Sequence, residues 1–124
     1  MAVLADRGVH PAVVDDQIGR PTFTADLAAG IRHLIEVGAP FGTYNLTCDG
    51  EPASWADVAA EVFAALGHDR AEIGRVSTAE YFADKPGAAV RPLNSVLDLT
   101  KILATGFRPR DWRAALPAYL AARR

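Results

Sequence analysis

Residues 13–28 change character twice within one short segment, and this constrains the local fold more than any other part of the chain. The segment begins with a β-branched run, passes through Gln-Ile-Gly-Arg-Pro-Thr, and continues with apolar and acidic residues from Thr24. Gly19 permits backbone angles that other residues avoid, and Pro21 fixes its own φ and disfavours helix at Arg20. The segment therefore predicts a strand, an irregular loop and a helix start, in that order.

The helix after this loop is predicted over residues 25–37. Thr24 is its expected N-cap, and Asp26 lies in the first turn, where a negative charge favours the helix dipole. Apolar residues follow at helical spacing: Leu27, Ile31, Leu34 and Ile35. Gly38 is expected to end the helix, and His33 lies off the apolar stripe, so we expect His33 in solvent.

The rest of the pattern predicts a small α/β unit. Strands are expected near residues 12–16, 43–47 and 73–76, and helices near 25–37, 55–66, 99–105 and 112–120. Ser54 with Asp57 and Ser77 with Glu80 have the spacing of capping boxes. The second pair predicts a further brief helix over residues 77–83. Trp55 lies on the apolar face of the helix near 55–66 and is expected in the core.

The composition excludes several classes of protein. The net charge of −2 gives no bias toward nucleic acid or an anionic membrane. No apolar run approaches the roughly 20 residues of a membrane span. A single cysteine, Cys48, excludes an intramolecular disulfide, and the three histidines lack metal-ligand spacing. These features predict a soluble cytoplasmic protein with no nucleic-acid or membrane partner.

One apparent catalytic motif has the wrong surroundings. Tyr81 and Lys85 form a Y-x-x-x-K pair, in which a tyrosine can donate a proton and a lysine can lower its pKa. Such a pair needs a helix that continues past the lysine, but Pro86-Gly87 follows at once. We therefore interpret Tyr81 as a packing residue and Lys85 as solvated. The sequence also contains no G-x-G-x-x-G or G-x-x-G-x-x-G loop for a dinucleotide.

The loop after the first strand holds four candidate ligand-binding residues. Gln17 offers donor and acceptor groups, and Thr22 offers a hydroxyl, so either can contact a sugar or a base. Gly19 and Pro21 shape the turn that presents them. A strand end, a polar loop and a helix start are the elements that place ligand groups at the carboxyl edge of an α/β sheet. Many such loops bind nothing, and helix capping remains an alternative role for Thr22.

A second candidate segment follows residue 90. Arg91 carries a planar, permanently charged group that suits bidentate contact with a diphosphate, and Pro92 stiffens the loop that presents it. Asn94 and Ser95 are neutral hydrogen-bonding residues beside it. The alternative is an exposed arginine in a mobile loop.

Several strings together resemble one protein family. Residues 13–28 contain VVDDQIGRPT and DLA, residues 42–46 spell GTYNL before a Ser-Trp helix start, and residues 91–98 spell RPLNSVLD. These segments resemble the dTDP-4-dehydrorhamnose reductase family of the extended short-chain dehydrogenases. The matches run in the family's order over segments 13–28, 42–66 and 91–103, and the resemblance spans nearly all of the chain.

The resemblance implies that residues 1–124 are the C-terminal, substrate-binding portion of a Rossmann-type protein. It implies that the nucleotide-binding half, with the catalytic tyrosine and lysine, precedes this portion, and the helix end at residues 1–8 without an N-cap agrees. The intact protein would reduce the 4-keto group of dTDP-4-dehydro-L-rhamnose with NADPH. This portion alone would be inactive, would not hold NADPH, and would bind dTDP only weakly. Surfaces facing the missing half are expected to be apolar.

Other functions stay open at this point. Another extended short-chain dehydrogenase or epimerase acting on nucleotide sugars is one alternative, and a regulatory or interaction module of the same family is another. The resemblance also allows a homodimer and a Mg²⁺ ion held by glutamates, although no glutamate of this sequence can be matched to that role.

Overall fold

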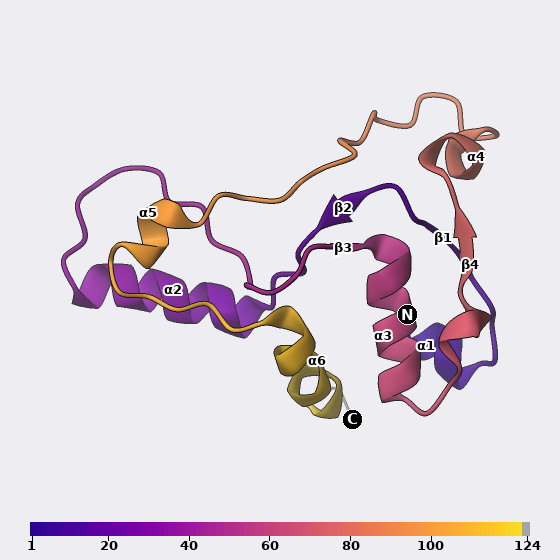
Figure 1. Ribbon diagram of the computed structural model, residues 1–124, viewed down its shortest axis with the longest axis horizontal. Helices are drawn as coiled ribbons and strands as arrows, with labels where there is room; N and C mark the ends of the chain where they lie inside the picture. The colour runs from indigo at the N-terminus through magenta and orange to yellow at the C-terminus, as the bar shows by residue number, and fades with distance from the viewer. Residues whose placement is uncertain (123–124) are drawn as a thin grey trace. The chain divides into compact units, whose positions relative to one another are not determined.

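The computed structural model describes residues 1–122, which fall into two compact units (Figure 1). The first unit contains Met1–Gly19 and Pro52–Ser95. The second contains Arg20–Glu51 and the described chain from Val96 onward. Within the described residues, no helix has the length and apolar character needed to cross a bilayer.

The first unit is built around two short strand pairs and one long helix. Its elements are α1 (Ala2–Asp6), β1 (Ala12–Val14), β2 (Ile18–Gly19), β3 (Ala53–Ser54), α3 (Trp55–Ala65), a 3₁₀ turn (Arg70–Glu72), β4 (Gly74–Val76) and α4 (Thr78–Phe82). Strand β1 runs parallel to β4, from Ala12 opposite Gly74 to Val14 opposite Val76. Strand β2 pairs antiparallel with β3. The predicted strands near 12–16 and 73–76 are confirmed as a parallel pair.

The buried face of α3 differs from its predicted apolar face. Phe63 is completely buried among Ala56, Ala59, Ala60 and other residues of the first unit's core. Trp55 is 52% exposed, so its predicted place in the core is wrong. The side chains that pack are mostly alanines, which leave room for β1 and α1 to approach, and the large indole at the first helical position lies outside this face.

Both predicted capping boxes are present in the first unit. The Ser54 hydroxyl accepts from the Asp57 N–H at 3.0 Å, and the Asp57 carboxylate accepts from the Ser54 N–H at 3.1 Å. Ser77 and Glu80 make the same reciprocal pair at the start of α4. Each box satisfies two backbone donors that a helix start would otherwise leave without partners, which is why the starts of α3 and α4 were predictable.

The second unit contains three helices, α2 (Thr24–Glu36), α5 (Thr100–Leu103) and α6 (Trp112–Ala121). The predicted N-cap role of Thr24 is wrong, because Phe23 is the N-cap residue and makes no side-chain capping bond. The predicted strand near residues 43–47 is also wrong, since that segment joins no ladder and only Asp49, beyond it, makes an isolated bridge to Asp111. A strand needs a neighbour, and no part of the described chain supplies one there.

The face of α2 that packs within the second unit is polar or small. Asp26 and Gly30 are buried, and a side chain on Gly30 would collide with Leu46. His33 lies 3.1 Å from both the Thr105 carbonyl and its hydroxyl, so the expectation that His33 is in solvent is wrong. The predicted apolar stripe instead faces outward, with three side chains at least 39% exposed: Leu27, Ile31 and Ile35.

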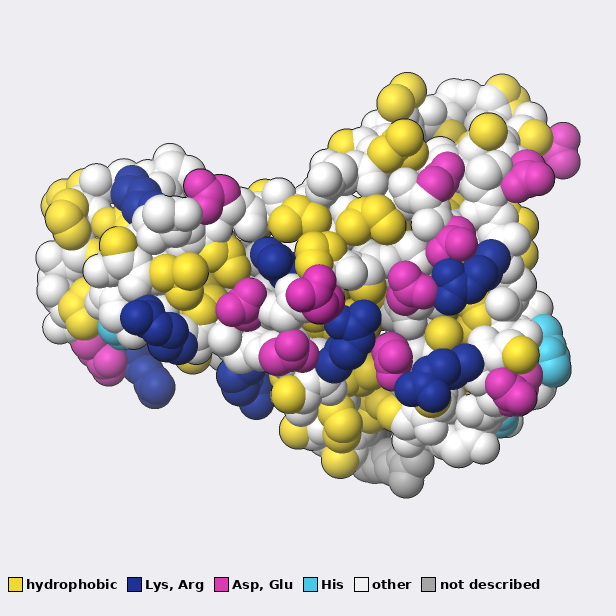
Figure 2. Space-filling model, viewed as in Figure 1, with side chains coloured by type: hydrophobic (Ala, Val, Ile, Leu, Met, Phe, Trp, Pro, Cys, Tyr) yellow, Lys and Arg dark blue, Asp and Glu magenta, His cyan; other side chains and the backbone are white. Residues whose placement is uncertain are grey.

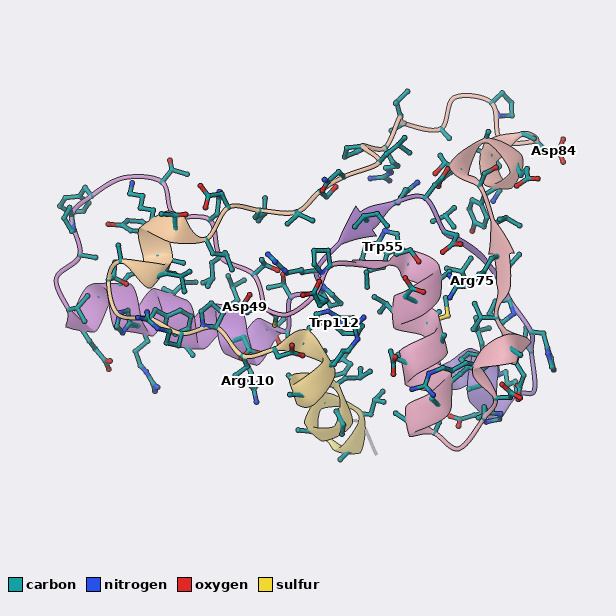
Figure 3. All side chains as sticks on the ribbon, in the orientation of Figure 1. Asp49, Trp55, Arg75, Asp84, Arg110 and Trp112 are labelled. Carbon is teal, nitrogen blue, oxygen red and sulfur yellow. The ribbon has the colours of Figure 1, made fainter. Side chains whose placement is uncertain are left out.

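Side-chain hydrogen bonds from Arg110 and Trp112, both labelled in Figure 3, connect segments of the second unit. Arg110 donates from Nε and Nη2 to the two carboxylate oxygens of Asp26, at 2.6 and 2.9 Å. The Cys48 thiol lies 3.7 Å from the same carboxylate. Trp112 is fully buried and donates from its indole nitrogen to the Glu51 carbonyl at 2.9 Å. Residues far apart in the sequence thus join through hydrogen bonds that each involve one buried side chain.

Candidate ligand-binding site

A cavity of about 420 Å³ lies within the first unit. This volume falls in the range of small-molecule sites. Its lining is mostly apolar and aromatic, with two polar groups able to orient a ligand. The lining residues are Met1, Ala12, Val13, Val14, Gln17, Trp55, Val58, Ala59, Tyr81, Phe82 and Arg91.

Two of the predicted site residues, Gln17 and Arg91, line this one cavity. Gln17 lies in the turn between β1 and β2 and is 9% exposed. Arg91 is exposed and lies in the segment between α4 and residue 95. The cavity therefore combines a buried amide with a solvated cation, which is a combination suited to a ligand with both a polar ring and an anionic group.

Backbone pairing explains why two residues 74 positions apart in the sequence meet. The Ile18 N–H donates to the Leu93 carbonyl at 2.8 Å, and the Ser95 N–H donates to the Ile18 carbonyl at 2.8 Å. Asn94 forms a parallel bridge with Ile18. Strand β2 thus holds the segment that follows Arg91. Asn94, Ser95 and Gly19 are close in sequence to the polar residues of the cavity, but they do not line the cavity.

The other two predicted site residues, Pro21 and Thr22, belong to the second unit. The Thr22 hydroxyl lies 2.6 Å from the Thr47 hydroxyl. The Pro21 carbonyl accepts a longer hydrogen bond, 3.4 Å, from Thr47. In this structure both residues hold the loop against Thr47, and neither lines the cavity of the first unit.

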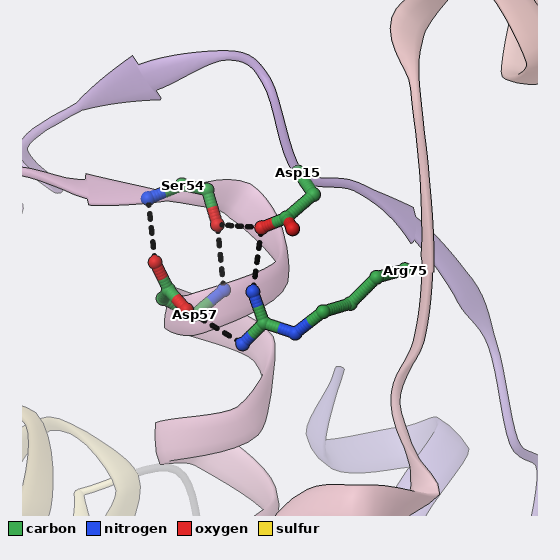
Figure 4. A network of polar contacts seen from close by, with 4 residues as sticks. All are labelled: Asp15, Ser54, Asp57 and Arg75. Atoms are coloured by element: carbon green, nitrogen blue, oxygen red, sulfur yellow. Dashed lines mark hydrogen bonds and ion pairs between the residues drawn. The ribbon is translucent and has the colours of Figure 1, made fainter.

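Asp15, Ser54, Asp57 and Arg75 form a network of hydrogen bonds and ion pairs that connects elements around the cavity (Figure 4). Arg75, on β4, donates to Asp15 at 2.5 Å and to Asp57 at 2.6 Å. Ser54 donates to Asp15 at 2.8 Å. Burial opposes ionisation of Asp57, but hydrogen bonds from Arg75 and Ser54 outweigh it and lower the Asp57 pKa. The network therefore joins the end of β1 to the start of α3 through Arg75.

Sequence reasoning missed this network and one aromatic residue of the cavity. Arg75 had no visible partner in the sequence, because Asp15 and Asp57 are 60 and 18 positions away. Trp55, assigned to the core, instead lines the cavity. The available signal was its position as the first residue of α3, where a side chain can lie outside the packed face of a helix.

The Y-x-x-x-K pair takes up no catalytic arrangement on one helix. Helix α4 ends at Phe82, so Lys85 lies beyond it. The Lys85 ammonium lies 3.5 Å from the centre of the Tyr81 ring, a cation–π contact, and Lys85 is exposed. Tyr81 lines the cavity. Within residues 1–122, no cluster of three or more histidine, cysteine, aspartate or glutamate side chains could hold a metal ion.

Comparison with known proteins points to one family. The sequence matches the family described as RmlD substrate binding domain over residues 1–124. It is 43% identical over 112 residues to a dTDP-4-dehydrorhamnose reductase from Aggregatibacter actinomycetemcomitans, covering 84% of this chain and 37% of that protein. It is 45% identical over 109 residues to a protein of the same name from Streptomyces griseus, covering 84% of this chain and 34% of that protein.

A solved structure shares the fold. The crystal structure of dTDP-4-dehydrorhamnose reductase from Bacillus anthracis str. Ames, in complex with NADP, superposes with a TM-score of 0.83 at 30% identity. The match covers 97% of this chain and 41% of that one. The mixed α/β fold expected of a fragment of an extended short-chain dehydrogenase is thereby confirmed, and the chain spans well under half the length of these relatives.

Proposed function

This chain belongs to the RmlD substrate-binding-domain family, and from that premise we propose that it forms the nucleotide-sugar-binding portion of an NADPH-dependent dTDP-4-dehydrorhamnose reductase. Residues 1–124 are the C-terminal portion in this proposal, and a preceding Rossmann half is its partner. The longer protein reduces the 4-keto group of dTDP-4-dehydro-L-rhamnose to give dTDP-L-rhamnose.

The observation that carries this proposal is the shared cavity of Gln17 and Arg91. A nucleoside diphosphate sugar presents a planar base, two phosphates and a ring with hydroxyls. The guanidinium of Arg91 matches the phosphates in charge and geometry. The aromatic lining, including Trp55 and Tyr81, suits a planar or sugar ring. Gly19, Asn94 and Ser95 stay proposed as binding residues of the first unit, and Pro21 and Thr22 stay proposed as binding residues of the second unit.

The residues of this chain do not fit the cofactor itself. A dinucleotide needs a glycine-rich turn between a strand and a helix, and the sequence contains no G-x-G-x-x-G or G-x-x-G-x-x-G. In the proposed whole enzyme, NADPH supplies the hydride and a tyrosine outside this chain supplies the proton. This chain's own contribution is to bind and orient the sugar nucleotide.

Replacing Arg91 by alanine is expected to weaken binding of dTDP at least tenfold. A charge-assisted hydrogen bond contributes about 1.5–3 kcal/mol, and about 1.4 kcal/mol corresponds to tenfold in affinity. Isothermal titration calorimetry of the 124-residue chain with dTDP measures the change. Arg7→Ala is the matched control, since Arg7 is an exposed arginine of the same unit that does not line the cavity. Equal affinities for both variants would contradict the proposal.

A further inference from the structure

The side-chain amide of Gln17 is almost fully buried and yet has one hydrogen-bonding group unused. Gln17 lines the cavity, and its Nε2 donates to the Thr78 hydroxyl at 2.9 Å. Within residues 1–122 its Oε1 accepts no hydrogen bond. No fully enclosed side-chain nitrogen or oxygen among those residues lacks a partner, so this oxygen keeps some access to solvent. A ligand in the cavity could satisfy it.

The orientation of the amide follows from its two neighbours. Asp16 accepts from the Thr78 hydroxyl at 2.6 Å and from the Thr78 N–H at 3.0 Å. An ionised carboxylate can only accept, and a hydroxyl has a single proton to give. Because that proton goes to Asp16, the Thr78 oxygen can only accept from Gln17. The amide nitrogen must therefore face Thr78, which leaves the carbonyl oxygen for the ligand.

The charge of Asp16 supports this direction. Hydrogen bonds from the side chain and then the backbone of Thr78 lower the Asp16 pKa, so the carboxylate is ionised at neutral pH. Asp16 adjoins Gln17 in the sequence, while Thr78 begins α4 and lies 61 positions from Gln17. The hydrogen bonds from Gln17 to Thr78 and from Thr78 to Asp16, together called the relay, thus connect the turn after β1 to the start of α4.

We infer that Gln17 recognises a hydrogen-bond donor on the ligand, an N–H or O–H group, and discriminates against a ligand that presents only an acceptor there. This inference rests on the proposed function. In a thymidine diphosphate sugar the donors are the imide N3–H of the base, the 3′-hydroxyl of the deoxyribose and the hydroxyls of the hexose. Asp16 and Thr78 act through Gln17 and are positioning residues.

Calorimetric titrations of four proteins test the relay: the unsubstituted chain, Gln17→Ala, Thr78→Val and Thr78→Ser. With dTDP-L-rhamnose, which carries all three kinds of donor, Gln17→Ala is expected to weaken binding about tenfold. Thr78→Val keeps the side-chain shape but removes the hydroxyl, so its affinity should fall toward that of Gln17→Ala. Thr78→Ser keeps the hydroxyl and should bind as the unsubstituted chain does. Thermal unfolding of each variant verifies that it folds.

Three comparisons distinguish the source of the donor. N3-methyl-dTDP lacks the imide N–H, 3′-deoxy-dTDP lacks the sugar hydroxyl, and dTDP without the hexose lacks the remaining hydroxyls. The ligand without the recognised donor should bind the unsubstituted chain about tenfold more weakly than its parent. The same pair should bind Gln17→Ala equally, which separates a lost hydrogen bond from a steric effect of the methyl group.

Two results would overturn the inference. One is that Gln17→Ala binds every one of these ligands as tightly as the unsubstituted chain, and the other is that Thr78→Val and Thr78→Ser have equal affinities. If Arg91→Ala still weakens dTDP binding in that case, the proposed function stands without the relay. If the unsubstituted chain binds neither dTDP nor dTDP-L-rhamnose, the proposed function and this inference are both overturned.

Discussion

Replacing Phe63 by alanine is expected to lower the free energy of unfolding by about 3–5 kcal/mol. The ring is completely buried in the core of the first unit, and deletion of so large a side chain loses its burial and leaves a cavity. Urea unfolding followed by far-ultraviolet circular dichroism measures the loss. Hydrogen exchange read by mass spectrometry should show lost protection in peptides of the first unit.

Phe41→Ala is the control for this experiment. The side chain of Phe41 is fully exposed, at 108% of the reference area, so its removal should change stability by less than about 0.5 kcal/mol. Similar losses for Phe63→Ala and Phe41→Ala would contradict the assignment of the core.

Replacing Arg110 by alanine is expected to lower the free energy of unfolding by clearly more than replacing Arg32 by alanine does. The Asp26 side chain is 8% exposed, and removal of its bidentate partner leaves a buried charge without compensation. Because the Arg110 side chain is 55% exposed, solvent screens the pair, and the loss should stay below that of a fully buried ion pair. Thermal and urea unfolding measure it. Arg32→Ala, which removes an exposed arginine paired with Glu36 at 3.7 Å, should cost about 0.5 kcal/mol or less.

The same pair predicts how stability depends on pH. Hydrogen bonds from Arg110 hold the Asp26 pKa below its usual range in the folded chain. The stability that this pair contributes is therefore present above the unfolded pKa of about 4 and is lost as the pH falls through the folded pKa. Melting temperatures measured from pH 7 down to pH 3 should fall more steeply in the unsubstituted chain than in Arg110→Ala. Parallel curves would contradict this account of the acid sensitivity.

Elements whose determinants are local could be predicted from the sequence. The starts of α3 and α4 depend on capping boxes that lie within four residues, and both are present. The end of α2 depends on Gly38, which adopts a φ of 59°. In each case the residues that satisfy the helix terminus are neighbours in the chain, so spacing alone was enough.

Elements that depend on distant partners could not be predicted. The segment near residues 43–47 has the composition of a strand, but ladder formation requires a second strand beside it. The stripe of α2 that packs is decided by Leu46, Thr105 and Arg110, which lie 16 to 84 positions from their partners. Hydrophobic periodicity cannot reveal that a glycine leaves space for a leucine side chain of another segment. It also cannot reveal that a carboxylate pairs with an arginine far away in the sequence.

The candidate site shows the same division. The types of residue at Gln17 and Arg91 indicated polar recognition and anion binding, and the structure brings both to one cavity. The relay from Asp16 through Thr78 spans 62 positions, and the Arg75 network spans 60. Directional hydrogen bonds of this range are set by the parallel pairing of β1 with β4, which no local pattern encodes.

The two tryptophans differ in their exposure to solvent, so each can serve as an intrinsic fluorescent probe of its own surroundings. Trp112 is fully enclosed and hydrogen-bonded to a carbonyl, whereas Trp55 is half-exposed at the cavity. Acrylamide should therefore quench the emission of Trp55 and leave the emission of Trp112 unquenched. With Trp55→Phe and Trp112→Phe as single-emitter versions, fluorescence separates occupation of the cavity from the integrity of the helix that carries the second indole.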